Sequence, residues 1–281
     1  MSNKQFQSNL TKRSGRGAQG RETVDTKPAP WTLVVSKGIV LPIFPTKRSL
    51  PSIKSHLTSS HDTRDYLESG LGLVILVRYD ITPVGSYDEL LLVPGAFKQR
   101  PVTSQSPEQP RKGERLCDRR IPRIYVSSEK SLRNGRQNWG IRKELANFEW
   151  IETKGWFTTS QRVIVRDPTS QQVILDATFK SLPFFVPIVL DWLGKLIPSL
   201  VERNIDAEGL SVGDDEWLQT RIGGFGWCQP CWLSKCEDVP APQRFFPRLT
   251  DIHAMLGVQL KGNLVFNSPK KLLPPDTAPI R

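Results

Sequence analysis

Histidine is scarce in this chain. Its 281 residues include three histidines, His56, His61 and His253, which lie far apart in the sequence. No G-x-S-x-G motif accompanies them, so the sequence gives no support to a serine hydrolase with a histidine base. A phosphate-binding loop and a G-x-G-x-x-G fingerprint are also missing, which argues against the common nucleotide-binding enzymes. Any catalytic chemistry must therefore come from other side chains.

Cysteine is also rare, and three of the four cysteines are close together. Cys228, Cys231 and Cys236 have C-x2-C-x4-C spacing, and Cys117 lies in a basic segment. Zinc sites usually pair two such knuckles or add a nearby histidine, and a thiol-redox motif needs a βαβ setting. Neither is found here. We interpret the cysteines as buried or reduced structural thiols and expect no metal, with metal binding or redox use as the less favoured alternative.

Long uninterrupted hydrophobic runs are absent. The most apolar segment, Leu182–Val201, has the length of a membrane span but contains Asp191, Lys195 and three prolines. We expect it to be a buried segment or a lid that lines an apolar ligand cavity, with helical spacing of its apolar residues from Val189 onward. The N-terminus lacks the apolar region of a secretory signal, so we expect an intracellular, cytoplasmic protein with no membrane contact.

The formal net charge of +11 is concentrated in two segments. Residues 1–30 contribute a net charge of +4 and residues 98–123 contribute +5, and both are rich in residues typical of loops and tails. No aromatic and basic residues alternate in the manner of a nucleic-acid surface. We interpret these segments as solvated basic tails and do not expect a nucleic-acid partner.

The remaining pattern predicts a single, mainly β domain (α+β, with little helix) rich in turns, in agreement with 23 prolines. Short β-branched runs indicate strands, and Ser/Thr-rich and charged residues 46–70 indicate a surface loop. The expected strands are a pair within Pro30–Phe44 broken at Lys37-Gly38, Leu73–Val77, Leu90–Val93, Arg123–Ser128 and a hairpin within Gly155–Phe179. The expected divisions are a basic tail (1–29), the domain (30–265) with a basic loop insertion (98–122), and a C-terminal tail (266–281).

The stretch GRQNWGIRKELANF, Gly135 to Phe148, resembles the active-site signature of the acetoacetate decarboxylase family, approximately G-R-E-x-x-G-x-P-K-K-L-A. Matching positions are Gly135, Arg136, Gly140, Lys143, Leu145 and Ala146. Upstream, GSYDELLLVPGAF and PWTLVVSKGIVLPIF are similar to a strand and a hairpin of that family. The resemblance implies a curved, largely antiparallel sheet that closes into a cone or barrel around a buried pocket, and a homo-oligomer.

The resemblance also implies a chemistry. In that family the lysine at the position of Lys143 forms a Schiff base with a ketone, and the protonated imine accepts the electrons released with CO2. An amine with the ordinary pKa of about 10.4 is neutral in roughly one molecule in 10³ to 10⁴ at pH 7. Burial or a nearby cation can make such a lysine neutral, and acetoacetate decarboxylase is itself the standard example.

Two positions depart from the signature. Arg142 replaces the proline before the lysine, and Glu144 replaces the second lysine, whose charge is credited with activating the first. A carboxylate that faced Lys143 would favour the protonated amine, which is not nucleophilic. On an extended segment, however, neighbouring residues point to opposite faces, so Glu144 is expected to lie outside the pocket. Arg142 or Arg136 could then supply the cation.

Further site residues follow from the resemblance. Glu89, in SYDE, matches the family's pocket glutamate and would handle protons or orient the imine, with a solvent-facing strand acid as the alternative. Arg136 is the predicted substrate-binding residue. The family's N-terminal carboxylate-binding arginine has no clear match among Lys37, Lys47 and Arg48.

The leading hypothesis is a Schiff-base decarboxylase (a lyase) of a β-keto acid, with Lys143 as nucleophile, Glu89 as pocket acid and no cofactor. The basic tails, the apolar segment and Glu144 are similar to family versions from filamentous fungi, which suggests a polyketide-derived intermediate of secondary metabolism or toxin biosynthesis. Two alternatives stay open: an imine-forming aldolase, dehydratase or cyclase, and a non-catalytic barrel that binds an apolar ligand.

Overall fold

The computed structural model describes residues 26–46, 49–55, 67, 70–98, 117–189, 199–210, 216–239 and 246–272. Most of these residues belong to strands. The basic segments at residues 1–25 and 99–116 lie outside the described residues, as do Lys47, Arg48 and residues 190–198.

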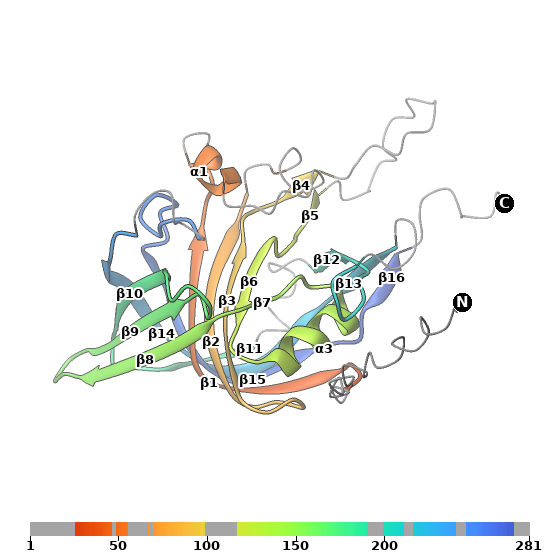
Figure 1. Cartoon of the computed structure of the whole chain (residues 1–281). Coiled ribbons are helices and arrows are strands. Elements are labelled where there is room, and N and C mark those ends of the chain that lie inside the picture. The colour runs from red at the N-terminus through yellow and green to blue at the C-terminus, as the bar shows by residue number, and fades with distance from the viewer. Residues whose placement is uncertain are drawn as a thin grey trace, which may run out of the picture.

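A single eleven-stranded sheet forms the body of the protein (Figure 1). Its strand order is β7-β6-β3-β2-β1-β15-β14-β10-β9-β8, and β11 pairs with β14 beside that path. All neighbours are antiparallel except β6 and β7. The strands are β1 (Trp31–Ile43), β2 (Gly72–Ile81), β3 (Tyr87–Val93), β6 (Arg123–Val126), β7 (Glu144–Leu145), β8 (Asn147–Lys154), β9 (Thr159–Arg166), β10 (Val173–Ser181), β11 (Val186–Val189), β14 (Ile222–Cys236) and β15 (Leu256–Phe266).

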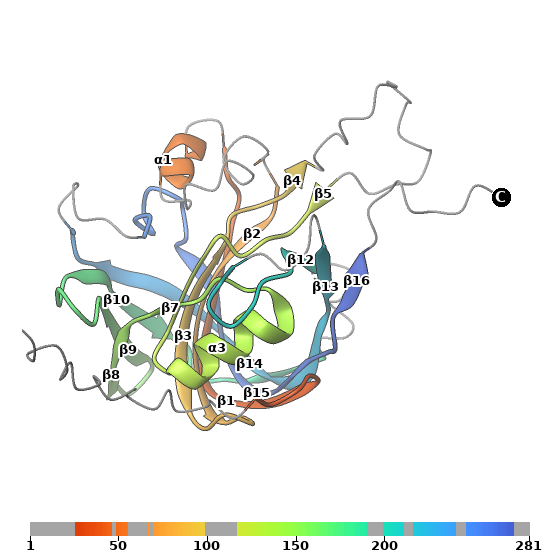
Figure 2. The same cartoon turned by 45° about the vertical axis from the view of Figure 1, so that its right-hand side comes forward.

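Smaller elements surround this sheet. A three-stranded sheet has the order β12 (Leu200–Arg203), β13 (Trp217–Thr220), β16 (Lys270–Leu272), and β4 (Phe97–Lys98) pairs with β5 (Cys117–Asp118). The described helices are α1 (Leu50–Ser55) and α3 (Glu129–Trp139). The main sheet curls strongly, and α3 and the three-stranded sheet lie on its concave side (Figures 1 and 2). The predicted mainly β fold with a curved antiparallel sheet is confirmed.

The two faces of the main sheet are both apolar, because each is covered. Along β3, Leu90 and Leu92 pack into one core cluster, and Tyr87 and Leu91 pack into the other. This alternation is the period of two that a strand imposes on its side chains. Glu89 has the same parity as Tyr87 and Leu91, so the strand places its carboxylate on the concave face among apolar side chains.

The first strand changes its buried face at a bulge. β1 is one continuous strand and not the predicted pair, and its register shifts between Val35 and Gly38, where a break was expected. Trp31 and Leu33 face the concave side, whereas Ile39 belongs to the opposite core cluster although it has the same parity. An extra residue at a bulge has this effect because it shifts the alternation of side chains by one. The Lys-Gly pair therefore marks a bulge and not a turn.

Several other expectations can be compared with the structure. The strand at Arg123–Ser128 and the hairpin within Gly155–Phe179 are present as β6 and as β9–β10. The expected domain end at residue 265 falls inside β15, and β16 follows it, so the C-terminal boundary must move to residue 272 or beyond. Within residues 46–70, expected to be a loop, Leu50–Ser55 form α1.

The apolar segment from Leu182 to Val201 is only partly described. Phe184 and Phe185 are exposed, whereas Ile188 and Leu200 line the cavity presented below. The helix expected from Val189 onward lies largely outside the described residues. Among the residues that the structure describes, none forms a helix long and apolar enough to cross a membrane.

Candidate functional site

The signature stretch is a helix followed by a short extended segment. Helix α3 begins after Ser128, whose hydroxyl accepts a hydrogen bond from the backbone N–H of Ser131, as a helix N-cap does. It ends at Gly140, which has a left-handed φ of 70°. A β-carbon at Gly140 would lie 2.1 Å from the carbonyl oxygen of Arg203, so only glycine fits at this stop. The chain then turns toward β7, and Lys143 directly precedes that strand.

The Lys143 amine is buried and contacts two polar groups. Its Nζ lies 2.9 Å from Glu89 Oε2 and 3.2 Å from Ser131 Oγ. Lys143 is 4% exposed and Glu89 is 3% exposed. The structure thus brings together two predicted site residues that are 54 positions apart in the sequence. It also adds Ser131, which the sequence reasoning missed.

Gly135 leaves space for the Lys143 side chain to cross helix α3. A β-carbon at this position would lie 2.5 Å from Lys143 Cε and 2.8 Å from Cδ. Both distances are too short for non-bonded carbon atoms, so the lysine side chain rests directly on the helix backbone. The first glycine of the signature is therefore needed for space and not for backbone conformation.

Two tyrosines extend the buried polar group. The ring of Tyr87 lies 5.4 Å from Lys143 Nζ, and the Tyr79 and Tyr87 rings are 4.9 Å apart. Burial, followed by the negative charge of Glu89, raises the pKa of both phenols well above the usual value, so both keep their protons. Tyr87 has the same strand parity as Glu89, and this period could have identified it from the sequence.

Glu144 does not face the lysine. Its carboxylate is half-exposed and lies 2.8 Å from Arg123 Nη1, on the other side of the extended segment. This is the arrangement that strand geometry predicts for consecutive residues. Arg142 is exposed and does not line the cavity, so it cannot supply the cation suggested for the pocket.

Arg136 contacts the backbone around the site. Its Nη2 donates a hydrogen bond of 2.9 Å to the carbonyl oxygen of Lys143, and its Nη1 donates to the carbonyl oxygens of Ala207 and Glu208. It does not belong to the residues that line the main cavity. The predicted role in substrate binding has no contact in this geometry to support it. The observed contacts instead hold the Lys143 segment against α3 and the 206–209 turn.

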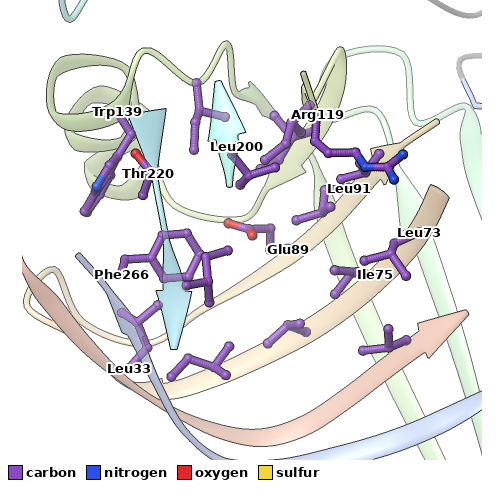
Figure 3. Close-up of a pocket in the computed structure, with 18 of the residues that line it drawn as sticks. Leu33, Leu73, Ile75, Glu89, Leu91, Arg119, Trp139, Leu200, Thr220 and Phe266 are labelled. Atoms are coloured by element: carbon purple, nitrogen blue, oxygen red, sulfur yellow. The ribbon is translucent and has the colours of Figure 1, made fainter. Parts of the chain in front are cut away.

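Lys143 and Glu89 both line a large apolar cavity. Figure 3 shows Glu89 among the residues of its wall. Its volume is about 870 Å³, and leucine, isoleucine, valine and aromatic side chains supply most of its wall. They come from β1, β2, β3, β6, β11, β14 and β15 of the main sheet, from β12, and from α3 and the residues that follow it. Trp31, Trp139 and Phe266 form a T-shaped aromatic cluster at one side, with ring centroids 4.9 and 5.7 Å apart.

Few polar side chains reach this cavity. Besides Lys143 and Glu89 they include Arg119, Ser199, Thr220, Arg221 and Asn267. The sequence reasoning identified none of these five, because they come from loops and strand ends with no local motif. Lys37, considered as a carboxylate-binding residue, instead forms a 3.0 Å ion pair with Glu152 and does not line the cavity.

The clustered cysteines lie on one strand, β14. Cys228 and Cys231 are buried and belong to the core clusters on opposite faces of the sheet, as an offset of three residues on a strand requires. Burial raises the pKa of the Cys231 thiol to about 12. Their sulfur atoms therefore cannot meet in one redox pair or one metal site. No group of three or more His, Cys, Asp or Glu side chains suited to a metal ion occurs in the described part of the chain.

Comparison with known proteins relates this chain to solved structures. The structure of acetoacetate decarboxylase from Legionella pneumophila superposes with a TM-score of 0.55 at 13% sequence identity, covering 95% of this chain and 98% of the other. A second acetoacetate decarboxylase structure has a TM-score of 0.49 at 9% identity, over 88% of this chain and 91% of the other.

The enduracididine biosynthesis enzyme MppR, solved with the condensation product of pyruvate and imidazole 4-carboxaldehyde, has a TM-score of 0.41 at 11% identity, with 90% of each chain covered. No family model matches the sequence, and no curated protein matches it. The protein thus has the acetoacetate decarboxylase-like fold that the signature suggested.

Proposed function

We propose that this protein is a Schiff-base-forming decarboxylase of a large, apolar β-keto acid, with Lys143 as the nucleophile. The observation that carries the proposal is the buried Lys143 amine, held by Glu89 and Ser131 in the wall of a large apolar cavity. Burying a lysine reduces the stability of a fold because its charge loses contact with water. Buried lysines are therefore often found where a functional site requires them. The fold shared with an acetoacetate decarboxylase agrees with this function.

The reaction needs only groups that the site contains. Glu89 takes a proton from the Lys143 ammonium, the resulting neutral amine adds to the substrate ketone, and water leaves, which forms an imine that is protonated on nitrogen. The bond to the carboxylate carbon then breaks, CO2 leaves, and the electron pair moves to the imine nitrogen to give an enamine. Protonation of its carbon and addition of water release a ketone and restore the lysine.

Glu89 is placed to move protons in these steps. Its Oε2 is 2.9 Å from the Lys143 nitrogen, which is within the reach required of a general acid or base. The apolar wall favours decarboxylation as well, because it does not solvate the carboxylate that is lost. Ser131 accepts a hydrogen bond from the same nitrogen and keeps the amine oriented.

The cavity size indicates the class of substrate. Cavities of about 300–1,000 Å³ hold drug-sized ligands and bury most of their surface. The 870 Å³ here lie near the upper end of that range, so a small acid such as acetoacetate would leave most of the apolar wall without contact. A long or multi-ring β-keto acid, such as a polyketide-derived intermediate, fits the volume and the polarity.

Release of CO2 from β-keto acids of increasing apolar size tests this function. We expect the rate above the spontaneous background to rise with apolar size and to disappear in Lys143→Met. Lys154→Met, which replaces an exposed lysine, is the matched control and should keep the activity. If Lys143→Met released CO2 as fast as the native protein, the proposal would be wrong.

Two other results would identify the alternatives. Imine formation without CO2 release would point to the aldolase, dehydratase or cyclase reading, which uses the same lysine. Saturable binding of apolar ligands with neither imine nor CO2 would point to a binding protein, for which the apolar cavity alone is sufficient.

A further inference from the structure

We infer that Thr220 and Arg221 form a second polar subsite in the cavity, which binds an acceptor oxygen of the substrate distant from the reacting ketone. Thr220 is the last residue of β13, and Arg221 follows it. Both line the cavity. Figure 3 shows Thr220 on the wall with Trp139 and Phe266, apart from Glu89.

The Thr220 hydroxyl is the main observation. Thr220 is 3% exposed, and its Oγ1 is buried without a hydrogen-bond partner among the described residues. More than nine-tenths of buried polar groups in proteins have a partner, and an unsatisfied one costs roughly 1–3 kcal/mol. Valine would have the same shape without that cost. A bound ligand that supplied the missing hydrogen-bond partner would explain why this position of the apolar wall has threonine and not valine.

Arg221 adds charge at the same place. Its side chain is exposed, lines the cavity, and makes no hydrogen bond or ion pair with the other described residues. The backbone at this point is fixed, because the Arg221 carbonyl accepts hydrogen bonds from the backbone N–H and the side-chain amide of Asn267. Ser199, another hydroxyl of the cavity, accepts a hydrogen bond from Gln219, whereas the Thr220 hydroxyl has no partner among the described residues.

The chemistry of these two residues defines the ligand group. An arginine only donates hydrogen bonds, and a threonine hydroxyl can donate one, so the group that meets both must be an acceptor. A carboxylate would accept strong hydrogen bonds from both residues, whereas a hydroxyl or carbonyl oxygen would be bound mainly through its hydrogen bond with Thr220. Such an oxygen cannot belong to the carboxylate that is lost, because that carboxylate stands one carbon from the ketone carbon attached to Lys143.

The inference takes from the proposed function only that this cavity holds the substrate. It therefore narrows the proposed substrate class to apolar keto compounds that carry an oxygen acceptor at the end distant from the reacting ketone. Binding can be measured apart from chemistry, because Trp31 and Trp139 line the cavity and their fluorescence should respond to an occupant.

The experiment uses a homologous series of methyl ketones that end in a carboxylate, a hydroxyl or a methyl group. Dissociation constants come from tryptophan emission with the full-length protein. At the best chain length we expect Thr220→Val to weaken the carboxylate and hydroxyl ligands by roughly threefold to tenfold, the loss of one ordinary hydrogen bond. The methyl-terminated ketone should bind unchanged, and Thr220→Ser should retain the native preference.

Arg221→Gln separates the two oxygen groups. It should weaken binding of the carboxylate ligand and leave binding of the hydroxyl ligand unchanged. In the native protein, added salt should weaken binding of the carboxylate ligand as well, because it screens the charge of Arg221. Because Thr220→Val removes an unsatisfied hydroxyl, it should fold with native stability, and Thr220→Ala serves for the same comparison if it does not. An equal effect of these variants on all three ligands, or no preference for a terminal oxygen in the native protein, would overturn the subsite.

The result can be told apart from failure of the proposed function. Borohydride trapping of the same ketones reports imine formation at Lys143 independently of affinity. A Thr220-dependent preference without any adduct would leave the subsite standing and remove the decarboxylase. An adduct without that preference would remove the subsite and leave the proposed function standing.

Discussion

At the scale of single residues, a few positions decide where the Lys143 amine lies. Glu89 and Ser131 bind its nitrogen, and Gly135 leaves room for its methylene groups. Glu144, the position that departs most from the signature, pairs with Arg123 outside the cavity. The acidic replacement therefore does not place a carboxylate against the lysine.

Gly135→Ala should separate stability from function. Alanine is favoured over glycine in a helix by up to about 1 kcal/mol, but its β-carbon would overlap Lys143 Cε. The end of a lysine side chain can move at little cost, so the folded state should persist, with the amine displaced from its native position but still within reach of Glu89.

We expect a thermal midpoint close to the native one and a fall in imine trapping of roughly 10²-fold, as for other small misplacements in catalytic sites. Gln137→Ala, at an exposed position on the same helix, is the control. Native trapping in Gly135→Ala would show that the contact with Gly135 is not needed.

The Lys143–Glu89 pair should show strong coupling in unfolding experiments. Removing one member of a buried ion pair typically costs about 3–5 kcal/mol, whereas replacing both by neutral groups costs little. Lys143→Met and Glu89→Gln should each lower the free energy of unfolding in urea. The double variant should lose at least about 2 kcal/mol less than the sum of the two. Additive losses would mean that the two side chains do not interact in solution.

At the scale of elements, helix α3 and the segment after it act together. Arg136 joins the helix to the Lys143 carbonyl and to the 206–209 turn, and burial lowers the pKa of its guanidinium. These contacts assign Arg136 to positioning of the lysine. Substrate binding, the role expected from the signature, would instead require its guanidinium to enter the cavity.

A substrate comparison distinguishes the two roles of Arg136. If it positions the lysine, Arg136→Gln should slow imine formation with keto acids and with neutral ketones by the same factor, roughly tenfold. Arg133→Gln, which removes an exposed ion pair of the same helix with Glu129, should change neither rate. A loss restricted to keto acids would instead assign Arg136 to the substrate carboxylate.

The elements differ in how far the sequence predicts them. Strands and the β9–β10 hairpin follow from apolar runs bounded by turn residues. Helix α3 has a start signal in Ser128-Glu129 and a stop at Gly140, which could have located it. The bulge in β1 could not be derived, because its register depends on the pairing with β2 and β15.

At the scale of the whole molecule, burial on both sides of the sheet controls several ionisable groups. The chain has four tyrosines, and burial raises the pKa of Tyr79, Tyr87 and Tyr125 above the usual value. A group whose pKa is raised on folding contributes fully to the stability of the folded state when the pH is below its pKa in the unfolded chain. This stability is lost as the pH rises toward its pKa in the folded protein. The unfolded phenols ionise near pH 10.

The protein should therefore lose stability in alkali. We expect the urea midpoint to be nearly constant up to about pH 9 and to fall above about pH 10, with Cys231 contributing in the same direction. At least three of the four phenols should ionise only when the protein unfolds. Reversible phenolate absorbance near pH 10 from two or more tyrosines, with native circular dichroism, would contradict this expectation.

A buried pocket was expected, but the polar residues of its wall other than Lys143 and Glu89 are what the sequence predicted least. The signature pointed to Lys143 and Glu89, and strand parity accounts for Glu89 facing inward. Thr220, Arg221 and Asn267 reach the same space from β13 and from the residues after β13 and β15, and no local pattern connects them. Such residues emerge only from tertiary packing, because the curl of the sheet and the position of the three-stranded sheet bring them together.

Borohydride trapping with a β-keto acid, followed by peptide mass analysis, tests the central claim most directly. We expect one adduct, on the peptide that contains Lys143, with the added mass of the decarboxylated ketone less its oxygen. The adduct should be absent from Lys143→Met and present in Lys154→Met. An adduct on another lysine, or no adduct from a substrate that the protein decarboxylates, would contradict the assignment of Lys143 as the nucleophile.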